Sequence, residues 1–304
     1  VDLAIRLGLF YGFIALGFIV SRVERIKNQL NKWITFLLIN FMMPLIIIDT
    51  LLTAAPSSLY ELIGIIGFTL TIHLLGFMLM YIRLRNAEIE QSEKGSQLLT
   101  VTFNNALFLP IPLTLIFIGE VGVPIIAIYS ITQMMLLATL GTFIASAYST
   151  NGDDVRATIK KVMTFPPLLA AVIGLLLLVS GLTIPPEVEP ILAGNSLVTT
   201  YLALFAVGLS LGLGSKIKWS RFSIETIATR QLIVPFIVGI LLLLSGFSAL
   251  TRNIILLQAL MPAGVFTVIY ASAMDLDSET AATNVTLGTI LLLPVVLIMP
   301  FLFV

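Results

Sequence analysis

Long apolar stretches alternate with short polar breaks along almost the whole chain. The apolar stretches cover residues 3–20, 33–53, 59–82, 97–118, 122–148, 164–181, 191–214, 227–246, 252–273 and 281–303. A membrane-spanning helix needs roughly 20 apolar residues, and these stretches are close to that length. The pattern therefore predicts an all-α integral membrane protein of ten transmembrane helices. We expect the first stretch to be a permanent helix, because no signal-peptide cleavage pattern accompanies it.

The composition of the chain is that of a protein surrounded by a lipid bilayer. Of the 304 residues, 58% are hydrophobic and 11% are charged, and the mean hydropathy is +1.09. The 16 basic and 16 acidic residues balance, so the charge gives no reason to expect a nucleic-acid partner. The chain has no cysteine, which excludes disulfides and thiolate metal sites. We expect no cofactor and no bound metal.

The positions of the basic residues predict the orientation of the helices. Apart from Arg6 and Arg252, they gather in alternate loops, which contain Arg22, Arg25, Lys27 and Lys32; Arg83, Arg85 and Lys94; Arg156, Lys160 and Lys161; and Lys216, Lys218 and Arg221, with Arg230 at the entry to the eighth span. Loops rich in Lys and Arg stay in the cytoplasm, so both termini are expected to be extracellular, in a multi-pass protein of the plasma membrane. No Lys or Arg is assigned to the middle of a span, so we expect a buried anion to be stabilised without a fixed cation.

Ten spans divide into two halves of five. The first repeat covers residues 1–150, a short cytoplasmic linker covers 151–161, and the second repeat covers 162–304. An odd number of spans in each half turns the second half upside down relative to the first. The sequence therefore predicts the inverted-repeat architecture of many secondary transporters.

The fourth span of each half contains helix-breaking residues at membrane depth. Pro110 and Pro112 interrupt the first of these spans, and Pro262 and Gly264 interrupt the second. Proline removes a backbone donor and glycine lets the chain unwind, so we expect both helices to break. One such kink alone often has no binding role. Two breaks at corresponding positions predict a substrate site, because the half-helices that follow them direct N–H groups and positive dipole ends toward it.

The motifs around these breaks resemble the auxin efflux carrier family, which includes the plant PIN proteins. The matching segments are residues 105–113, 118–120, 261–265, 270–271, 277–282 and 293–294, together with Pro44 and Gln133. The resemblance covers essentially the whole chain and implies the fold of bile-acid symporters, with broken helices four and nine crossing in a transport domain that slides against a scaffold domain. It further implies a secondary transporter that moves small organic anions, such as carboxylates, by elevator-type alternating access. A homodimer formed through the scaffold domain is also implied.

The resemblance assigns residues to the substrate site. Asn105 matches the crossover asparagine that holds the substrate carboxylate, and Gln133 matches a glutamine that lines the same pocket. Asn104 and Gln258 lie beside the two breaks and complete the candidate substrate site. Asn104 and Thr267 stand where plant members have prolines. The short loop between the halves resembles prokaryotic members.

Two ionisable residues within the predicted spans are candidates for ion coupling. They are Asp49 in the second span and His73, the chain's single histidine, in the third. Ionisable residues in a membrane usually face water or a polar partner, although solvation near the interface or hydrogen bonding in packing also explains these two. Proton coupling and sodium coupling, the latter as in bile-acid symporters, both stay open. The amide of Asn284 suits either a sodium ligand or a contact between helices.

A different class of protein, an intramembrane serine hydrolase using Ser210 and His73, is suggested by the motif Gly208-Leu-Ser210-Leu-Gly212. The nucleophile elbow that this motif describes requires a strand-to-helix turn. Here the motif lies inside an apolar span, where small residues allow close helix packing. We therefore expect a transporter and not an enzyme. A channel is a weaker alternative, because nothing in the sequence resembles a selectivity filter.

Overall fold

A computed structural model shows that the chain is built from helices. It describes residues 3–23, 27–53, 59–149, 160, 163, 164, 166–181, 184, 185, 187–213 and 217–299. The predicted linker 151–161 lies outside these residues apart from Lys160. Within the described residues there is no β-strand, and the one isolated bridge joins Asn104 to Ala263.

Six continuous helical stretches of the described chain are long and apolar enough to cross a membrane. They are Lys32–Asp49, Tyr60–Leu84, Glu120–Tyr148, Glu189–Leu209, Arg221–Leu243 and Ser278–Val296. Three shorter apolar helices, which cover Ala4–Val20, Pro166–Val179 and Ala249–Leu260, fall in three more of the predicted spans. The prediction of an all-helical chain of membrane type is confirmed, and the ten-span inverted repeat stays a prediction.

The chain forms two compact units, and each is assembled from segments that lie far apart in the sequence. Unit 1 contains Val1–Ser58, Leu107–Ile131 and Thr164–Gly214, and unit 2 contains Leu59–Ala106, Thr132–Met163 and Ser215–Val304. The predicted division into residues 1–150, 151–161 and 162–304 separates two sequence repeats, whereas the two units are defined by how compactly their residues pack. It therefore stays a separate prediction.

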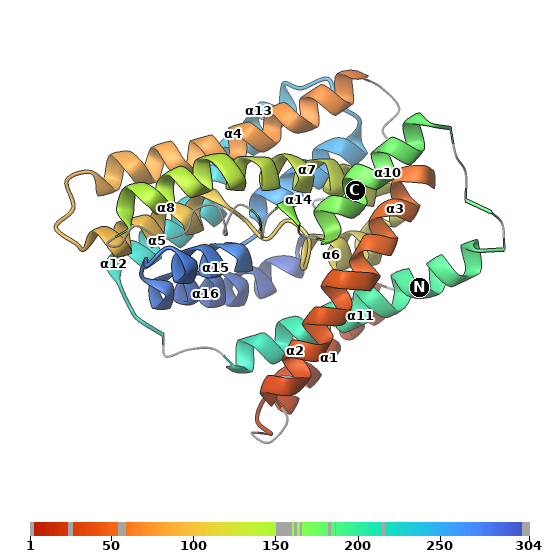
Figure 1. Ribbon diagram of the computed structural model, residues 1–304, viewed down its shortest axis with the longest axis horizontal. Helices are drawn as coiled ribbons and strands as arrows, with labels where there is room; N and C mark the ends of the chain where they lie inside the picture. Colours follow the sequence, from red (N-terminus) through yellow and green to blue (C-terminus); the bar gives the residue numbers. More distant parts are fainter. Residues whose placement is uncertain are drawn as a thin grey trace. The chain divides into compact units, whose positions relative to one another are not determined.

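Unit 1 is organised around the pairing of α1 with α11, and α10 packs beside α3 (Figure 1). Its helical elements are α1 (Leu3–Val20), α2 (Lys27–Leu37), η1 (Leu38–Met42), α3 (Met43–Thr53), α6 (Pro110–Phe117), η2 (Glu120–Gly122), most of α7 (Val123–Leu136), α10 (Pro166–Val179) and α11 (Glu189–Leu213). A Cβ atom on Gly208 of α11 would overlap the backbone carbonyl of Ile14 on α1. The small residue in the Gly208–Gly212 motif therefore allows two helix backbones to approach closely.

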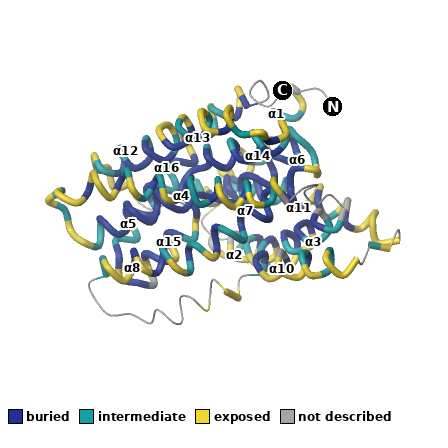
Figure 2. Tube along the Cα trace, turned by 90° about the horizontal axis from the view of Figure 1, so that it is seen from above, coloured by how far each residue is buried: buried dark blue, intermediate teal, exposed yellow. Residues whose placement is uncertain are grey.

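Unit 2 is organised around α5, which packs against several neighbouring helices. Its helical elements are α4 (Leu59–Leu84), α5 (Gln91–Thr102), the end of α7, η3 (Leu137–Gly141), α8 (Thr142–Tyr148), α12 (Arg221–Ala228), η4 (Thr229–Ile233), α13 (Val234–Leu243), α14 (Ala249–Leu260), α15 (Val265–Ala273) and α16 (Ser278–Val296). Helices α4, α8, α12, α15 and α16 all contact α5. Every residue from Lys94 to Thr102 is buried, and most of α5 is dark blue in Figure 2. A helix rich in polar residues thus forms the interior of this unit.

The buried polar side chains of α5 are hydrogen-bonded to the helices around it. The side-chain oxygen of Gln97 accepts bonds from Thr226 at 2.7 Å and from Asn284 at 2.8 Å. The amide of Asn284 also donates to the hydroxyl of Thr100 at 2.8 Å. Buried polar groups must find such partners, and here they connect α5 to α12 and α16. The Asn284 amide nitrogen therefore contributes to contacts between helices.

Asp277 caps the start of α16 and lies outside the predicted spans. One carboxylate oxygen accepts the backbone N–H of Thr280 at 3.0 Å, and the other accepts the ammonium of Lys218 at 2.6 Å. Burial alone would raise the pKa of this carboxyl, but its bonds with Lys218 and Thr280 outweigh burial and hold the pKa below its usual value of 3.8. A lowered carboxyl pKa stabilises the fold above pH 3.8, and this contribution is lost as the pH falls through the folded-state pKa.

We expect the Asp277→Ala variant to lose about 1 kcal/mol of stability, which is typical for removal of a helix cap. Asp277→Asn is the matched control, because its amide oxygen can still cap α16 while the charge that faces Lys218 is gone. Thermal unfolding of the purified proteins from neutral to acidic pH measures both effects. Acidification should destabilise the wild type more than either variant. Equal acid sensitivity of wild type and Asp277→Asn would contradict a stabilising role for the Asp277 carboxylate charge.

Candidate functional site

The two interrupted helices meet inside unit 2. After α5 and α14 end, their chains run extended as residues 103–106 and 261–264, which together we call the crossing. Two backbone hydrogen bonds join the segments, from the Asn105 N–H to the Pro262 carbonyl (2.8 Å) and from the Gly264 N–H to the Phe103 carbonyl (2.9 Å). The crossing therefore supplies partners for backbone groups that the broken helices would otherwise leave unsatisfied, as unwound chain within a membrane protein requires.

The residues predicted to break the helices occupy different places. Pro262 and Gly264 lie in the crossing, and a Cβ atom on Gly264 would be 2.6 Å from the carbonyl oxygen of Asn104. Only glycine allows the two segments to approach this closely. Pro110 is the first residue of α6 and Pro112 lies in its first turn, both in unit 1. Proline is tolerated at a helix start, so the fourth span is interrupted upstream of its prolines and not at them.

The amide side chains predicted to bind substrate connect the two segments of the crossing to each other and to the residues around them. Asn104 donates to the backbone carbonyl of Gln258 at 2.8 Å and to its side-chain oxygen at 3.1 Å. Gln258 donates in turn to the carbonyl of Ala106 at 3.1 Å, and Gln133 donates to the carbonyl of Asn104 at 2.8 Å. The structure thus brings four predicted residues together, all buried: Asn104, Asn105, Gln133 and Gln258. Three of their amides position the crossing itself.

Arg230 is a charged residue at the crossing that the sequence did not identify. It lies in η4, is only 1% exposed, and donates to the backbone carbonyls of Met261 at 3.3 Å and Gln258 at 3.4 Å. The sequence placed Arg230 at the entry to the eighth span, so the prediction that no cation lies in the middle of a span is wrong. The helical stretch containing Arg230 begins at Arg221, earlier than the apolar pattern indicated, so Arg230 lies more than two turns into it. A guanidinium group on a long side chain can then reach the end of α14.

The position of Arg230 changes the electrostatics of the crossing. A helix carries partial negative charge at its C-terminal carbonyls and partial positive charge at its N-terminal N–H groups. Arg230 offsets the negative end of α14, while the N-terminus of α15 follows directly after Gly264. The combination of a fixed cation and a helix N-terminus favours a negatively charged ligand.

The two candidates for ion coupling belong to different units. His73 is fully buried on α4 of unit 2, where its Nε2 lies 2.9 Å from the side-chain oxygen of Gln133. Asp49 is partly buried on α3 of unit 1. His73 is therefore part of the hydrogen-bonded surroundings of the crossing.

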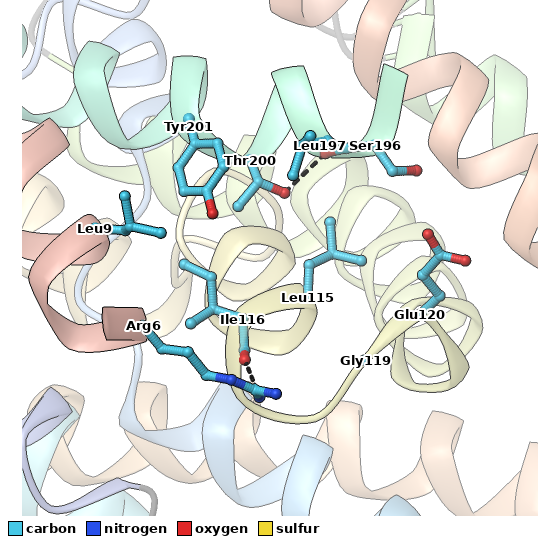
Figure 3. Close-up of a pocket in the computed structure, with 10 residues that line it drawn as sticks. All are labelled: Arg6, Leu9, Leu115, Ile116, Gly119, Glu120, Ser196, Leu197, Thr200 and Tyr201. Atoms are coloured by element: carbon cyan, nitrogen blue, oxygen red, sulfur yellow. Dashed lines mark hydrogen bonds between the residues drawn. The ribbon is translucent and has the colours of Figure 1, made fainter. Parts of the chain in front are cut away.

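Unit 1 contains a cavity of about 480 Å³ with a mixed polar and apolar lining (Figure 3). Its lining includes Arg6 and Leu9 of α1, Leu115 and Ile116 of α6, Gly119 and Glu120 after α6, and Ser196, Leu197, Thr200 and Tyr201 of α11. The guanidinium of Arg6 donates to the carbonyl of Ile116 at 2.6 Å, near the C-terminus of α6. This is the favourable end of a helix for a cation. The cavity includes none of the predicted substrate residues that the structure describes.

Comparison with known proteins decides the class of this chain. The family model described as membrane transport protein matches residues 10–300, which is nearly the full length. The chain belongs to this family of membrane transport proteins. The family is the one predicted from the motifs around the breaks, the auxin efflux carriers.

Two archaeal transport proteins are similar to this family member. An uncharacterized transporter from Methanothermobacter thermautotrophicus is 23% identical over 285 residues, which cover 91% of each chain. An uncharacterized transporter from Methanocaldococcus jannaschii is 23% identical over 206 residues, which cover 66% of each chain. The similarity to the first of these relatives extends over nearly the entire transporter.

Membership of a transporter family confirms the prediction that the chain is not an enzyme. The local structure agrees, because Ser210 lies within the continuous helix α11 and not at a strand-to-helix turn. The side chain of Ser210 lies outside the described residues. The serine-hydrolase alternative is therefore withdrawn.

Proposed function

We propose that this membrane transporter carries small organic anions, and that the anionic group, typically a carboxylate, binds at the crossing. The observation that carries this proposal is the buried guanidinium of Arg230, which donates to Met261 in the crossing, four residues before α15 begins. A charged ligand in a low-dielectric site needs a compensating charge or several donors. Arg230 and the N-terminus of α15 supply both kinds of stabilisation.

The amides around the crossing give the proposed site directed donors without further charge. Asn105 is assigned to the ligand carboxylate, while Asn104, Gln133 and Gln258 hold the backbone in position through the bonds described above. Neutral amides can orient a carboxylate and still release it, which a carrier requires. Phe103 and Met261 are buried in the same segments and favour an apolar or aromatic body behind the carboxylate. Short dicarboxylates are the alternative substrate class.

Transport is proposed to follow an elevator-type alternating-access cycle in a plasma-membrane protein with ten helices in two inverted repeats. Support for a moving body comes from the compactness of unit 2, which contains every residue of the crossing. We further propose that both termini are extracellular and that the transporter forms a homodimer. These proposals extend the family assignment to architecture and mechanism.

Ligand binding tests the proposed site through its effect on thermal stability. A ligand that binds only the folded protein at about 100 times its Kd adds roughly 2.7 kcal/mol of stability. We expect phenylacetate or succinate to stabilise the purified protein, and phenylacetamide, the neutral analogue of phenylacetate, to have no effect. Asn105→Ala should weaken the response, whereas Asn40→Ala, which removes an amide bonded to its own helix on α2 and η1, should preserve it. Equal stabilisation by acid and amide would contradict an anion site.

A further inference from the structure

The hydrogen bonds of His73 place two acceptors against the two nitrogen atoms of its ring. Nδ1 lies 2.6 Å from the backbone carbonyl oxygen of Thr69, which can only accept a hydrogen bond. Nε2 lies 2.9 Å from the side-chain oxygen of Gln133. The protonation state of His73 therefore depends on whether the oxygen or the nitrogen of the Gln133 amide faces Nε2.

The orientation of Gln133 is fixed by its other hydrogen bond. Its amide lies 2.8 Å from the carbonyl oxygen of Asn104, so the nitrogen must face Asn104 and the oxygen must face His73. A neutral imidazole has one N–H donor, whereas an imidazolium has two. Both bonds of the His73 ring are consequently formed only when the ring is doubly protonated. With a neutral ring, one nitrogen lone pair faces an oxygen lone pair in a fully buried site.

The charges around His73 decide when the second proton is stable. The helices that pack against α4 carry Glu93 and Lys94 on α5, Arg252 on α14 and Arg230 on η4, and α4 itself carries Glu61 and Arg83. Within the described chain, Arg230 is the charged group whose field acts on His73, and the ring of Phe103 lies beside it with centroids 5.6 Å apart. Two buried positive charges repel each other strongly in a low-dielectric site. The negative charge of an anion at the crossing would offset the positive charges of both Arg230 and doubly protonated His73.

We propose that the crossing binds its organic anion together with one proton, which His73 carries on Nε2, and that transport is thereby coupled to protons. This inference rests on the proposed anion site. Before binding, His73 keeps the proton on Nδ1 that bonds to Thr69. One further proton enters from the aqueous side to which the site is open, attaches to Nε2 and donates to Gln133, which bonds to the crossing at Asn104. The same proton leaves on the opposite side after the anion, so a monocarboxylate moves without net charge.

His73 can be observed directly, because it is the only histidine in the chain. Isotope-labelled histidine in the purified full-length protein, prepared with a histidine-free tag, reports by NMR whether one or both ring nitrogens carry a proton. We expect saturating phenylacetate to convert the ring to the doubly protonated form at a pH where the free protein is singly protonated. Phenylacetamide should leave the ring unchanged. Because binding takes up one proton, the apparent Kd for phenylacetate should rise about tenfold per pH unit at pH values where the ring is singly protonated in the free protein and doubly protonated in the complex.

Variants separate proton coupling from structural hydrogen bonding. In His73→Gln the new amide can still donate to Gln133 but does not titrate, so we expect binding of phenylacetate to persist with no pH slope. In wild type, binding of phenylacetate with a ring that stays singly protonated would overturn proton coupling and leave the anion site intact. A ring that is doubly protonated at every pH, with or without ligand, would equally overturn it. Failure of phenylacetate and succinate alike to bind would overturn the proposed function itself, and the inference with it.

Discussion

Replacing Arg230 by methionine is expected to remove anion binding and to destabilise unit 2. The substitution preserves an unbranched apolar side chain but leaves the carbonyls of Gln258 and Met261 without these donors. Losing hydrogen bonds from a buried charged group costs about 1.5–3 kcal/mol each, with a further penalty for acceptors that stay unsatisfied. The same range predicts a loss of carboxylate affinity on the order of 10- to 100-fold.

The matched control is Arg221→Met, which makes the same chemical change in the same helical stretch. The Arg221 side chain is 79% exposed and, among the described residues, pairs with Glu225 at the surface, where such pairs contribute little. This variant should retain wild-type stability and carboxylate binding. Arg230→Lys should retain part of the binding, because it keeps the charge and loses the planar donor group. If Arg230→Met binds carboxylates with wild-type affinity, the buried cation does not contribute to anion binding.

The Gly264→Ala substitution should open the crossing and abolish transport. Its Cβ atom would lie 2.6 Å from the Asn104 carbonyl oxygen and 3.0 Å from the carbonyl carbon, which are backbone atoms that cannot rotate away. Relief of this overlap requires the two segments to separate, with loss of the bonds that join Phe103 to Gly264 and Asn105 to Pro262. Overpacking of this kind typically costs about 1–3 kcal/mol. Thermal unfolding and uptake into proteoliposomes measure the two effects.

Gly67→Ala is the control for this prediction. Gly67 lies on an exposed face of α4, and a Cβ atom there would meet no atom of the described residues within 4 Å. Alanine within a helix stabilises it by roughly 0.5–1 kcal/mol relative to glycine, so this variant should be at least as stable as wild type. If both alanine variants transport equally well, close approach at Gly264 is not required for function.

The length and spacing of the apolar stretches were sufficient to predict an all-helical membrane protein, because a helix in a bilayer must satisfy its backbone internally and expose apolar side chains. The interruption of the fourth span was predicted from Pro110, but the extended segment lies upstream of it. Proline marks the start of the following helix, where its missing N–H has no cost. The sequence thus identified the existence of the break more accurately than its position.

Arg230 could not be assigned from local sequence, because it follows other basic residues and resembles part of a cytoplasmic loop. Its role depends on contacts with carbonyls about 30 residues further along, at 3.3 and 3.4 Å, and such pairings are fixed by tertiary packing. The hydrogen bonds by which Asn104 and Gln258 position the crossing also depend on tertiary packing. Gly208 was interpreted more successfully, since its position inside an apolar span already favoured helix packing, and the contact with Ile14 agrees.

Uptake into proteoliposomes is the most direct test of the claim that the crossing belongs to an organic-anion carrier. Initial rates are compared for radiolabelled phenylacetate, succinate and phenylacetamide, in vesicles containing wild type, Arg230→Met or Arg221→Met. The account predicts saturable uptake of at least one carboxylate, no protein-dependent uptake of the amide, and strong reduction in Arg230→Met alone. Absence of saturable carboxylate uptake by wild type, or equal uptake by all three proteins, would contradict it.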